Sequence, residues 1–335
     1  MMNRFASLAL LGAVLCWDYA DAYGEAKQFL IVSSSRTHSI GYALVPNNVP
    51  QMMVLKELIP VNTGLTFPQG LAVDPWRRFL YVADPTMQQL VAYKLIVSGD
   101  DLHVGDRFVV AKDVEVRWVA VDGLGNVWFT EEPHHKVMMV SAQNLDGGIT
   151  TPEIVYDGSK SSPVDAPAGI VADNYHVYWV NKLNGQNIGN VVTGLNAMSA
   201  GGTTAIAISD AKCYGIAMAG PNVFYTDEQS NLYGVPRVGG VTPTKVSTEF
   251  KEARGIAFDG MESMYVADKS QSAVFVFPAN QPTLRAGLAM QKVANMDGAY
   301  GLAVYTVSEY AQAGSTSLSG SLVLAVLAIL MAVRP

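Results

Sequence analysis

One short pattern recurs six times along the chain and constrains the fold more than any other feature of the sequence. Each copy has a glycine or tryptophan, three mostly apolar residues and usually an aspartate, and most are followed by a longer apolar run ending in Asp, Asn or Glu. The copies begin at residues 70, 118, 169, 215, 255 and 301, at intervals of 48, 51, 46, 40 and 46 residues. A repeat of this length is typical of a four-stranded blade in a β-propeller.

Each copy predicts a series of strands. In the first copy, Gly70–Asp74 predicts a short strand, Phe79–Asp84 a longer second strand and Gln89–Lys94 a third. The second strand is apolar at nearly every position, which is expected when both faces of a sheet are buried against neighbouring sheets. Blades that pack face to face provide this burial, so the repeat predicts an all-β fold.

The copy that begins at Gly301 lacks a second strand, and the missing strands occur at the start of the chain. Gln28–Ser33 predicts a second strand, Ser39–Leu44 a third and Met52–Leu55 a fourth. Strands from both ends of the chain in one blade would close the ring and remove exposed sheet edges. We therefore predict a six-bladed β-propeller over residues 23–307, closed by N- and C-terminal strands that share one blade.

The first residues are typical of a secretory signal peptide. Arg4 precedes an apolar run from Phe5 to Trp17, and Ala20-Asp21-Ala22 offers small residues for cleavage. We predict a signal peptide over residues 1–22. The alternatives are a buried helix or a signal anchor, for which the apolar run is short.

The last residues resemble a signal for a glycosylphosphatidylinositol (GPI) anchor. Small residues at Ala313–Thr316 precede a polar spacer and an apolar run, Leu322–Val333. The spacer is short and Arg334 adds a charge, but the alternative of a transmembrane helix is disfavoured because twelve residues span only about 18 Å. Residues 308–335 are therefore predicted to be a linker and anchor signal, which places the protein on the extracellular face of the cell membrane. The predicted attachment site is Gly314, or alternatively Ala313 or Ser315.

The charge of the chain argues against nucleic acid as a partner. The net charge is −7, and removal of both terminal signals leaves 20 basic and 27 acidic residues, so the charge stays −7. No run of Lys and Arg interrupts this acidic balance.

The chain has two cysteines, and Cys16 lies in the predicted signal peptide. Cys213 then has no partner within the mature chain. It lies beside an apolar strand, which favours a buried, inert thiol over a reactive one or a link between two chains.

Two kinds of copy resemble known repeats. Pro68–Asp74 followed by Leu80–Asp84 resembles the NHL repeat, and Val177–Asn181 and Val223–Asp227 are similar to the YWTD repeat of lipoprotein-receptor propellers. Both families share the six-bladed architecture with the gluconolactonase, paraoxonase and strictosidine-synthase group. The resemblance covers residues 27 to about 306, and it implies a fold more than a function.

A ligand of a propeller usually meets one mouth of the central channel, near the residues that enter the innermost strands. Arg117 and Arg254 would there bind a carboxylate, a phosphate or an acidic peptide side chain. Alternatively, these arginines pair with Glu115 and Glu252 and only hold the ring together. The predicted entering residues are Gln69, Arg117, Ala168, Tyr214, Arg254 and Tyr300.

The resemblance to the gluconolactonase group implies an alternative function, a hydrolase or lyase that acts in the channel. Enzymes of that group hold a divalent cation near these positions with Glu, Asn and Asp, because a hard cation needs oxygen ligands. Two guanidinium groups would repel a cation. We therefore predict no cofactor, with calcium or zinc expected only for the enzyme, and we assign no catalytic residue.

Two further groups of residues invite a chemical interpretation. Glu131–His135 combines acids and imidazoles, but the spacing of a known zinc motif is absent, so a solvated turn is favoured. Aspartates recur from blade to blade and are predicted to cap turns: Asp74, Asp122, Asp173, Asp227, Asp259 and Asp268. We thus favour a recognition module that binds a protein or a small acidic ligand, and a structural adhesion module is a third possibility.

Overall fold

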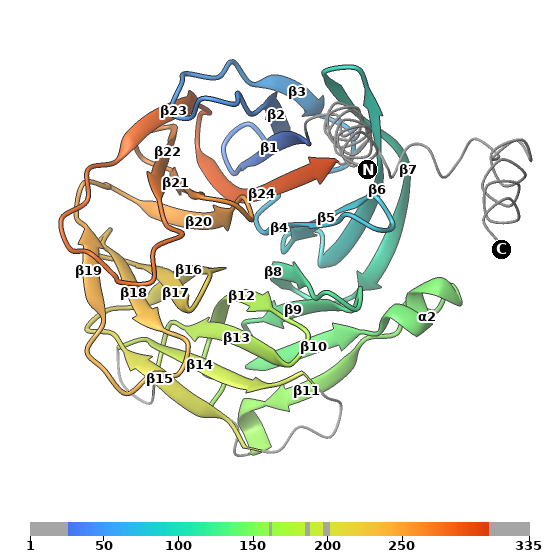
Figure 1. The fold of residues 1–335 in the computed structure, drawn as a ribbon. Coiled ribbons are helices and arrows are strands. Elements are labelled where there is room, and N and C mark those ends of the chain that lie inside the picture. The colour runs from blue at the N-terminus through green and yellow to red at the C-terminus, as the bar shows by residue number, and fades with distance from the viewer. Residues whose placement is uncertain (1–25, 161–162, 185–187, 197–201, 308–335) are drawn as a thin grey trace, which may run out of the picture. The chain divides into compact units, whose positions relative to one another are not determined.

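The computed structural model describes residues 26–160, 163–184, 188–196 and 202–307. Within these residues, 24 strands form six four-stranded sheets. The sheets follow one another around a centre in Figure 1, and Gln28–Tyr305 form one compact unit. The predicted all-β, six-bladed β-propeller is confirmed.

The strands occupy four positions from the centre outwards. The innermost strands are β4 (Leu71–Asp74), β8 (Val116–Val121), β12 (Pro167–Ala172), β16 (Cys213–Ala219), β20 (Ala253–Phe258) and β24 (Ala299–Val307). The second strands are β5 (Phe79–Asp84), β9 (Val127–Glu131), β13 (His176–Asn181), β17 (Asn222–Asp227), β21 (Ser263–Asp268) and β1 (Lys27–Ser34). The third strands are β6 (Gln89–Ser98), β10 (Lys136–Val140), β14 (Asn190–Leu195), β18 (Leu232–Pro236), β22 (Ala273–Pro278) and β2 (Ile40–Leu44). The outer strands are β7 (Asp101–Lys112), β11 (Glu153–Asp157), β15 (Thr204–Ile208), β19 (Thr244–Ser247), β23 (Gln291–Asn295) and β3 (Lys56–Ile59).

Two short helices complete the described secondary structure. Helix α2 (Ala142–Asp146) lies between β10 and β11, and a 3-10 turn, Gly158–Lys160, follows β11. The Ser141 side chain caps α2 by accepting a hydrogen bond from the Asn144 N–H.

The core lies between the blades, around the second strands. All residues of β9 and β17 are buried. All six second strands place a large ring in the core with almost no exposed surface: Phe29, Tyr81, Trp128, Trp179, Tyr225 and Tyr265. This burial on both faces explains why the second strands are apolar without alternation.

The repeat glycines let neighbouring innermost strands approach closely. A Cβ atom added to Gly301 would lie 1.9 Å from the Gln69 carbonyl oxygen, and one added to Gly215 would lie 2.1 Å from the Arg254 carbonyl oxygen. Both distances are far below van der Waals contact. At these two positions the backbone of the next blade therefore requires glycine.

The predicted closure is confirmed, because β24 from the C-terminal part pairs with β1 in the sheet β24-β1-β2-β3. Ser33 fastens this blade to its neighbour. Its hydroxyl donates to the Gln69 carbonyl oxygen at 2.7 Å and accepts from the Gly301 N–H at 2.8 Å.

The predicted fourth strand of this blade is wrong. Met52–Leu55 is not the outer strand, which is instead β3, a few residues later. Met53 is buried against the preceding blade, where its N–H donates to the Val293 carbonyl oxygen at 2.7 Å. An outer strand keeps one side in water, so the half-polar sequence Lys56–Ile59 suits it better than an apolar run does.

The recurring aspartates cap turns, as predicted. Asp74 Oδ1 accepts hydrogen bonds from the N–H groups of Trp76 and Arg77, both at 2.9 Å, and Asp122, Asp173 and Asp259 occupy equivalent turns. Asp227 and Asp268 end second strands and also accept backbone N–H groups. The aspartates are therefore part of the fold of each blade.

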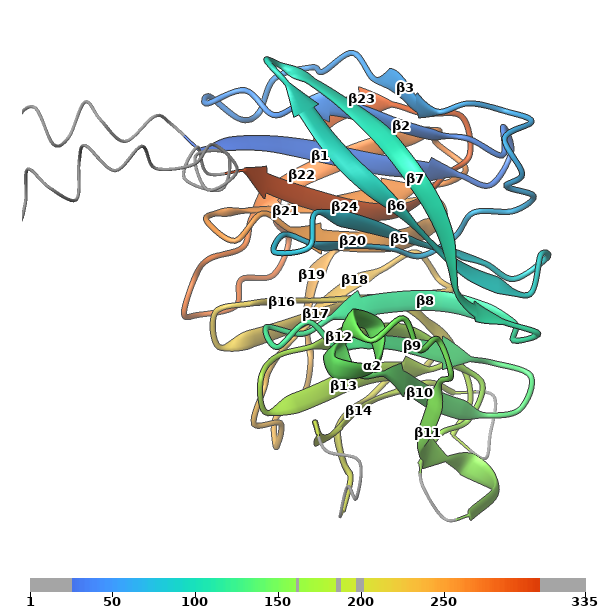
Figure 2. The same ribbon diagram turned by 90° about the vertical axis from the view of Figure 1, so that its right-hand side faces the viewer.

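The propeller has two faces, which Figure 2 shows from the side. We call the face where the innermost strands begin the entry face and the face where they end the exit face. Since the strands of a blade alternate in direction, the turns after first and third strands lie at the exit face.

The predicted terminal signals, residues 1–22 and 308–335, lie outside the described residues. Within the part of the chain that is described, no helix has the length and apolar character needed to cross a membrane.

Candidate functional site

The predicted ligand-binding residues lie at the entry face, at equivalent positions of the blades. Gln69 stands just before β4, and the others are the second residues of innermost strands: Arg117, Ala168, Tyr214, Arg254 and Tyr300. The structure brings several of them together around the phenol of Tyr300. Burial raises the pKa of Tyr300 to about 12, and the nearby charges of Arg254 and Arg117 oppose this rise.

Arg254 is held on two sides. Its guanidinium carbon lies 4.2 Å from the centre of the Tyr214 ring, within the range of a cation–π contact. Its Nη2 donates to Glu252 Oε1 at 2.7 Å, and its Nη1 donates to the Ala253 carbonyl oxygen at 2.9 Å. The guanidinium is therefore fixed in place before any ligand arrives.

Glu252 is in turn positioned by the end of a second strand. The buried carboxylate of Asp268 accepts a hydrogen bond from the Glu252 N–H at 3.2 Å. Burial would raise the pKa of Glu252, but hydrogen bonds from Ser270 and Lys269 outweigh it, and the net pKa is below the usual value. Glu252 is accordingly an anion at neutral pH.

Arg117 has two acidic neighbours. Its Nη2 donates to Glu115 Oε1, and its Nε lies 2.8 Å from Glu132 Oε2 in a charge contact without the alignment of a hydrogen bond. Both arginines thus form the pairs with Glu115 and Glu252 that the alternative interpretation predicted. Pairing alone does not exclude a ligand, because an arginine has five donors.

Two further charged residues of the mouth, Lys182 and Glu132, are not among the entering residues that the sequence predicted. Lys182 Nζ lies 2.5 Å from Glu132 Oε2 and 5.4 Å from the centre of the Tyr214 ring. Burial lowers the pKa of Lys182, Glu132 opposes this, and Arg117 and Arg254 lower the pKa further. Each of the two residues directly follows a second strand, so an alignment of the repeats at that position would have identified them.

An aromatic pair lies between these charges. Trp118 occupies the position where the other five copies have glycine, and its ring centre lies 5.8 Å from that of Tyr300. Both rings are almost fully buried. They come from blades on either side of the β4 blade, so they approach each other across the channel.

The ion pairs of the mouth involve more basic than acidic side chains. Four basic side chains meet three acidic ones in the contacts described above: Arg117, Lys182, Arg254 and Lys269 against Glu115, Glu132 and Glu252. In addition, Gln69 Oε1 is buried without a hydrogen-bond partner. The arrangement suits an anionic ligand that accepts hydrogen bonds from the basic side chains. Gln69 Oε1 could accept a hydrogen bond from a donor group of the same ligand.

A divalent cation does not fit these residues. The entering positions hold one amide, two guanidinium groups, two phenols and an alanine, where oxygen anions would be needed. Among the described residues, no three side chains of His, Cys, Asp or Glu converge as metal ligands. The mouth therefore lacks the donor set that the gluconolactonase group would lead one to expect.

The run Glu131–His135 is divided between different environments. His134 is largely exposed and pairs with Glu131, which is buried, while Glu132 belongs to the mouth. His135 Nδ1 accepts from the Ala166 N–H at 3.0 Å. The sequence predicted a solvated turn. His134 is exposed as that prediction requires, whereas Glu131 is buried.

Comparisons with known proteins identify the architecture. No family model matches the chain, and no curated protein matches it. Among solved structures, the chain is similar to one of the nidogen/laminin complex, with a TM-score of 0.64, 14% identity and coverage of 83% of this chain and 98% of the other. It is also similar to a gluconolactonase from Xanthomonas campestris, with a TM-score of 0.56, 10% identity and coverage of 83% and 90%. At these identities the likeness shows the fold, which is shared by a binding protein and an enzyme.

Proposed function

We propose that this propeller is a recognition module on the outer surface of the cell and that its entry-face mouth binds carboxylate groups of a protein or a small acid. The observation that carries the proposal is the group of cationic heads of Arg117, Lys182 and Arg254 around Tyr214 and Tyr300. Together with Lys269 they form ion pairs with three glutamates, Glu115, Glu132 and Glu252. A carboxylate from outside would accept hydrogen bonds from the donors that remain on these cations.

The chemistry of the donors supports an acidic ligand. A guanidinium presents a planar fork of donors that matches a carboxylate, and Arg254 is already fixed over Tyr214. The partly desolvated ammonium of Lys182 gains more from an added anion than an exposed lysine would. Glu132 and Glu252 compete with the ligand for the same donors. Because the attraction between the ligand and the cations is electrostatic, binding is expected to weaken as salt screens the charges.

The proposed location rests on the terminal sequences, with a signal peptide at residues 1–22 and a GPI anchor attached near Gly314. The nidogen propeller, which has the same fold, was solved in complex with laminin. This fold is therefore compatible with protein recognition, and the mouth chemistry favours an acidic segment as the recognised part.

The binding proposal is tested with a hexaglutamate peptide, and a hexaglutamine peptide serves as the neutral comparison. Calorimetry at low salt should detect hexaglutamate only, and R117A/R254A should abolish the signal while the melting curve stays cooperative. R107A changes an exposed arginine of β7 and should leave binding intact. Equal binding by wild type and R117A/R254A, or equal binding of both peptides, would contradict the proposal.

The anchor is tested separately on cells that express the chain. Phosphatidylinositol-specific phospholipase C should release the protein into the medium. Replacing Ala313, Gly314 and Ser315 with leucine should prevent attachment, because only small residues are accepted there. Surface protein that resists the phospholipase would count against the anchor and leave the mouth proposal untouched.

A further inference from the structure

The exposed apolar side chains are distributed unequally between the two faces. Fourteen large hydrophobic residues are exposed in the described part of the chain, and seven of them lie in the turns at the exit face. The entry-face connections hold one, Val61. The seven are Trp76, Leu124, Ile149, Tyr175, Val238, Val241 and Met261.

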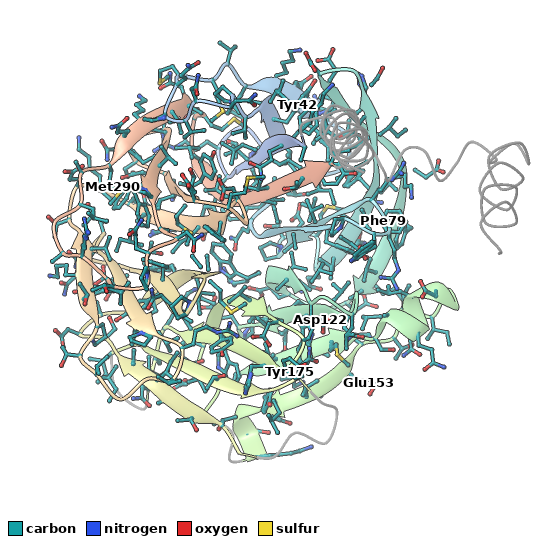
Figure 3. All side chains as sticks on the ribbon, viewed as in Figure 1. Tyr42, Phe79, Asp122, Glu153, Tyr175 and Met290 are labelled. Atoms are coloured by element: carbon teal, nitrogen blue, oxygen red, sulfur yellow. The ribbon has the colours of Figure 1, made fainter. Side chains whose placement is uncertain are left out.

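Four of these residues occupy the same position in four blades, and we call them the crown: Trp76, Leu124, Tyr175 and Met261. Their exposed fractions are 83%, 63%, 76% and 48%. Figures 1 and 3 look along the channel axis, and Tyr175 is labelled in Figure 3. A tight turn normally carries polar residues or glycine at such a position, so four large apolar side chains there need an explanation.

The turns present the crown residues rigidly. In each turn an aspartate at the end of the innermost strand accepts a hydrogen bond from the N–H of the crown residue. The distances are 2.9 Å for Trp76, 3.0 Å for Leu124, 2.7 Å for Tyr175 and 2.8 Å for Met261. The crown is thus a feature of the folded ring, and no loop has to be ordered to form it.

The apolar character continues from the crown into the channel. A cavity of about 290 Å³ is lined by the later residues of the innermost strands. Its lining includes apolar residues from all six blades, among them Val73, Val121, Val171, Met218, Phe258 and Val304. The exit face therefore offers apolar surface at its rim and its centre, whereas the entry-face mouth is charged.

We propose that the crown docks on the surface of a zwitterionic lipid bilayer, with Trp76 and Tyr175 in the interfacial layer. Trp and Tyr favour this layer because one end of each side chain is apolar and the other is polar. The net charge of −7 disfavours an anionic bilayer. This inference concerns a second surface and goes beyond the binding proposed for the mouth.

The position of the chain end makes a bilayer the fitting partner. β24 ends at the exit face, and the apolar run Leu322–Val333 begins after a spacer of residues 308–321. Extended, these residues reach at most about 50 Å. A bilayer that receives either a lipid anchor or the apolar run therefore lies within reach of the crown. Docking would direct the charged mouth away from the membrane.

The test follows the fluorescence of Trp76 in the full chain on phosphatidylcholine vesicles. Trp118, Trp128 and Trp179 are buried, and a W17F background removes the tryptophan of the predicted signal peptide. Brominated phosphatidylcholine should quench the Trp76 emission in protein that floats with vesicles. W76F should show no quenched component.

A crown variant separates docking from tethering. L124S/Y175S/M261S keeps Trp76 and the C-terminal segment, so it should still float, while the quenched fraction of Trp76 falls at least about tenfold. V61S/I208S removes exposed apolar side chains away from the crown and should be quenched like the wild type. Circular dichroism spectra of all variants verify that the ring is intact.

Three results would overturn the proposal. The first is a vesicle-bound wild type whose Trp76 is not quenched, or a full chain that does not float. The second is quenching that is equal in the crown variant. The third is a shift of the Trp76 emission with protein concentration in the absence of lipid, which would assign the crown to contact with a second copy of the chain.

Discussion

Arg254 lies over the ring of Tyr214, with its guanidinium carbon 4.2 Å from the ring centre, and its Nη2 is 2.7 Å from Glu252. The two residues come from neighbouring innermost strands, β20 and β16. Because this guanidinium is stacked on one side and paired on another, its remaining N–H donors point in fixed directions. This geometry is what makes the entry-face mouth a candidate for selective recognition of a carboxylate.

The stacking of Arg254 on Tyr214 predicts that a positive charge at residue 254 is not sufficient for full hexaglutamate binding. R254K keeps the positive charge but loses the planar fork and most of the stacking, so hexaglutamate binding should weaken about threefold to tenfold. Calorimetry at constant low salt measures the change. R107K on the outer strand β7 is the matched control and should bind as the wild type does. A full retention of affinity in R254K would show that only net charge matters.

The repeat glycines predict a strong effect on stability. G301A places a methyl group 1.9 Å from the Gln69 carbonyl oxygen, so two blades must separate, at a cost of roughly 2 kcal/mol or more. Thermal unfolding should show a midpoint lowered by several degrees. Gly202 has open space around it, and G202A should change the midpoint little. Equal stability of both variants would contradict the close approach of the innermost strands.

The buried Asp268 predicts a link between the fold and the mouth. Its carboxylate accepts from the N–H groups of Lys251 and Gln271 at 2.6 Å and 2.9 Å, and from that of Glu252. D268A leaves these donors without a partner and should lower the free energy of unfolding by about 2–4 kcal/mol. Urea denaturation measures this loss, and the exposed D106A is the control. Hexaglutamate binding should weaken as well, since Glu252 positions Arg254.

The thiol of Cys213 is predicted to be inert in the native protein. It is fully buried as the sequence predicted, and this burial raises its pKa to about 12. At pH 8 only about one thiol in ten thousand is then ionised, so a thiol reagent should label the folded chain very slowly and the unfolded chain readily. Rapid labelling of the folded protein would show that the site is open.

The same pKa sets a direction for the dependence of stability on pH. The unfolded thiol ionises near its ordinary value of 9.0, whereas the folded thiol stays protonated to about pH 12. The unfolded state therefore loses its proton first, and stability falls as the pH rises above about 9. C213A should reduce this part of the alkaline loss, which urea denaturation at pH 8 and pH 10 can measure.

Much of the fold follows from local pattern. The six copies, the closure through β1 and β24 and the turn-capping role of the aspartates were predicted, because each depends on residues close in sequence that recur in every blade. The outer strand of the closing blade was misplaced. Met53 is apolar because it packs on the preceding blade, and a pattern within one segment does not show which neighbour buries it.

The sequence alone therefore determined the architecture and the six positions that enter the channel, since a repeat defines equivalent sites. Only the tertiary structure decided which side chains meet there. Lys182 meets Glu132 and Tyr214 from a separate blade, and Trp118 meets Tyr300 although their blades are distant in sequence. Trp76 and Tyr175 belong to the crown because their turns leave them exposed. The reason is physical: strand pattern depends on local periodicity and burial, whereas convergence and exposure depend on how the blades pack around the ring.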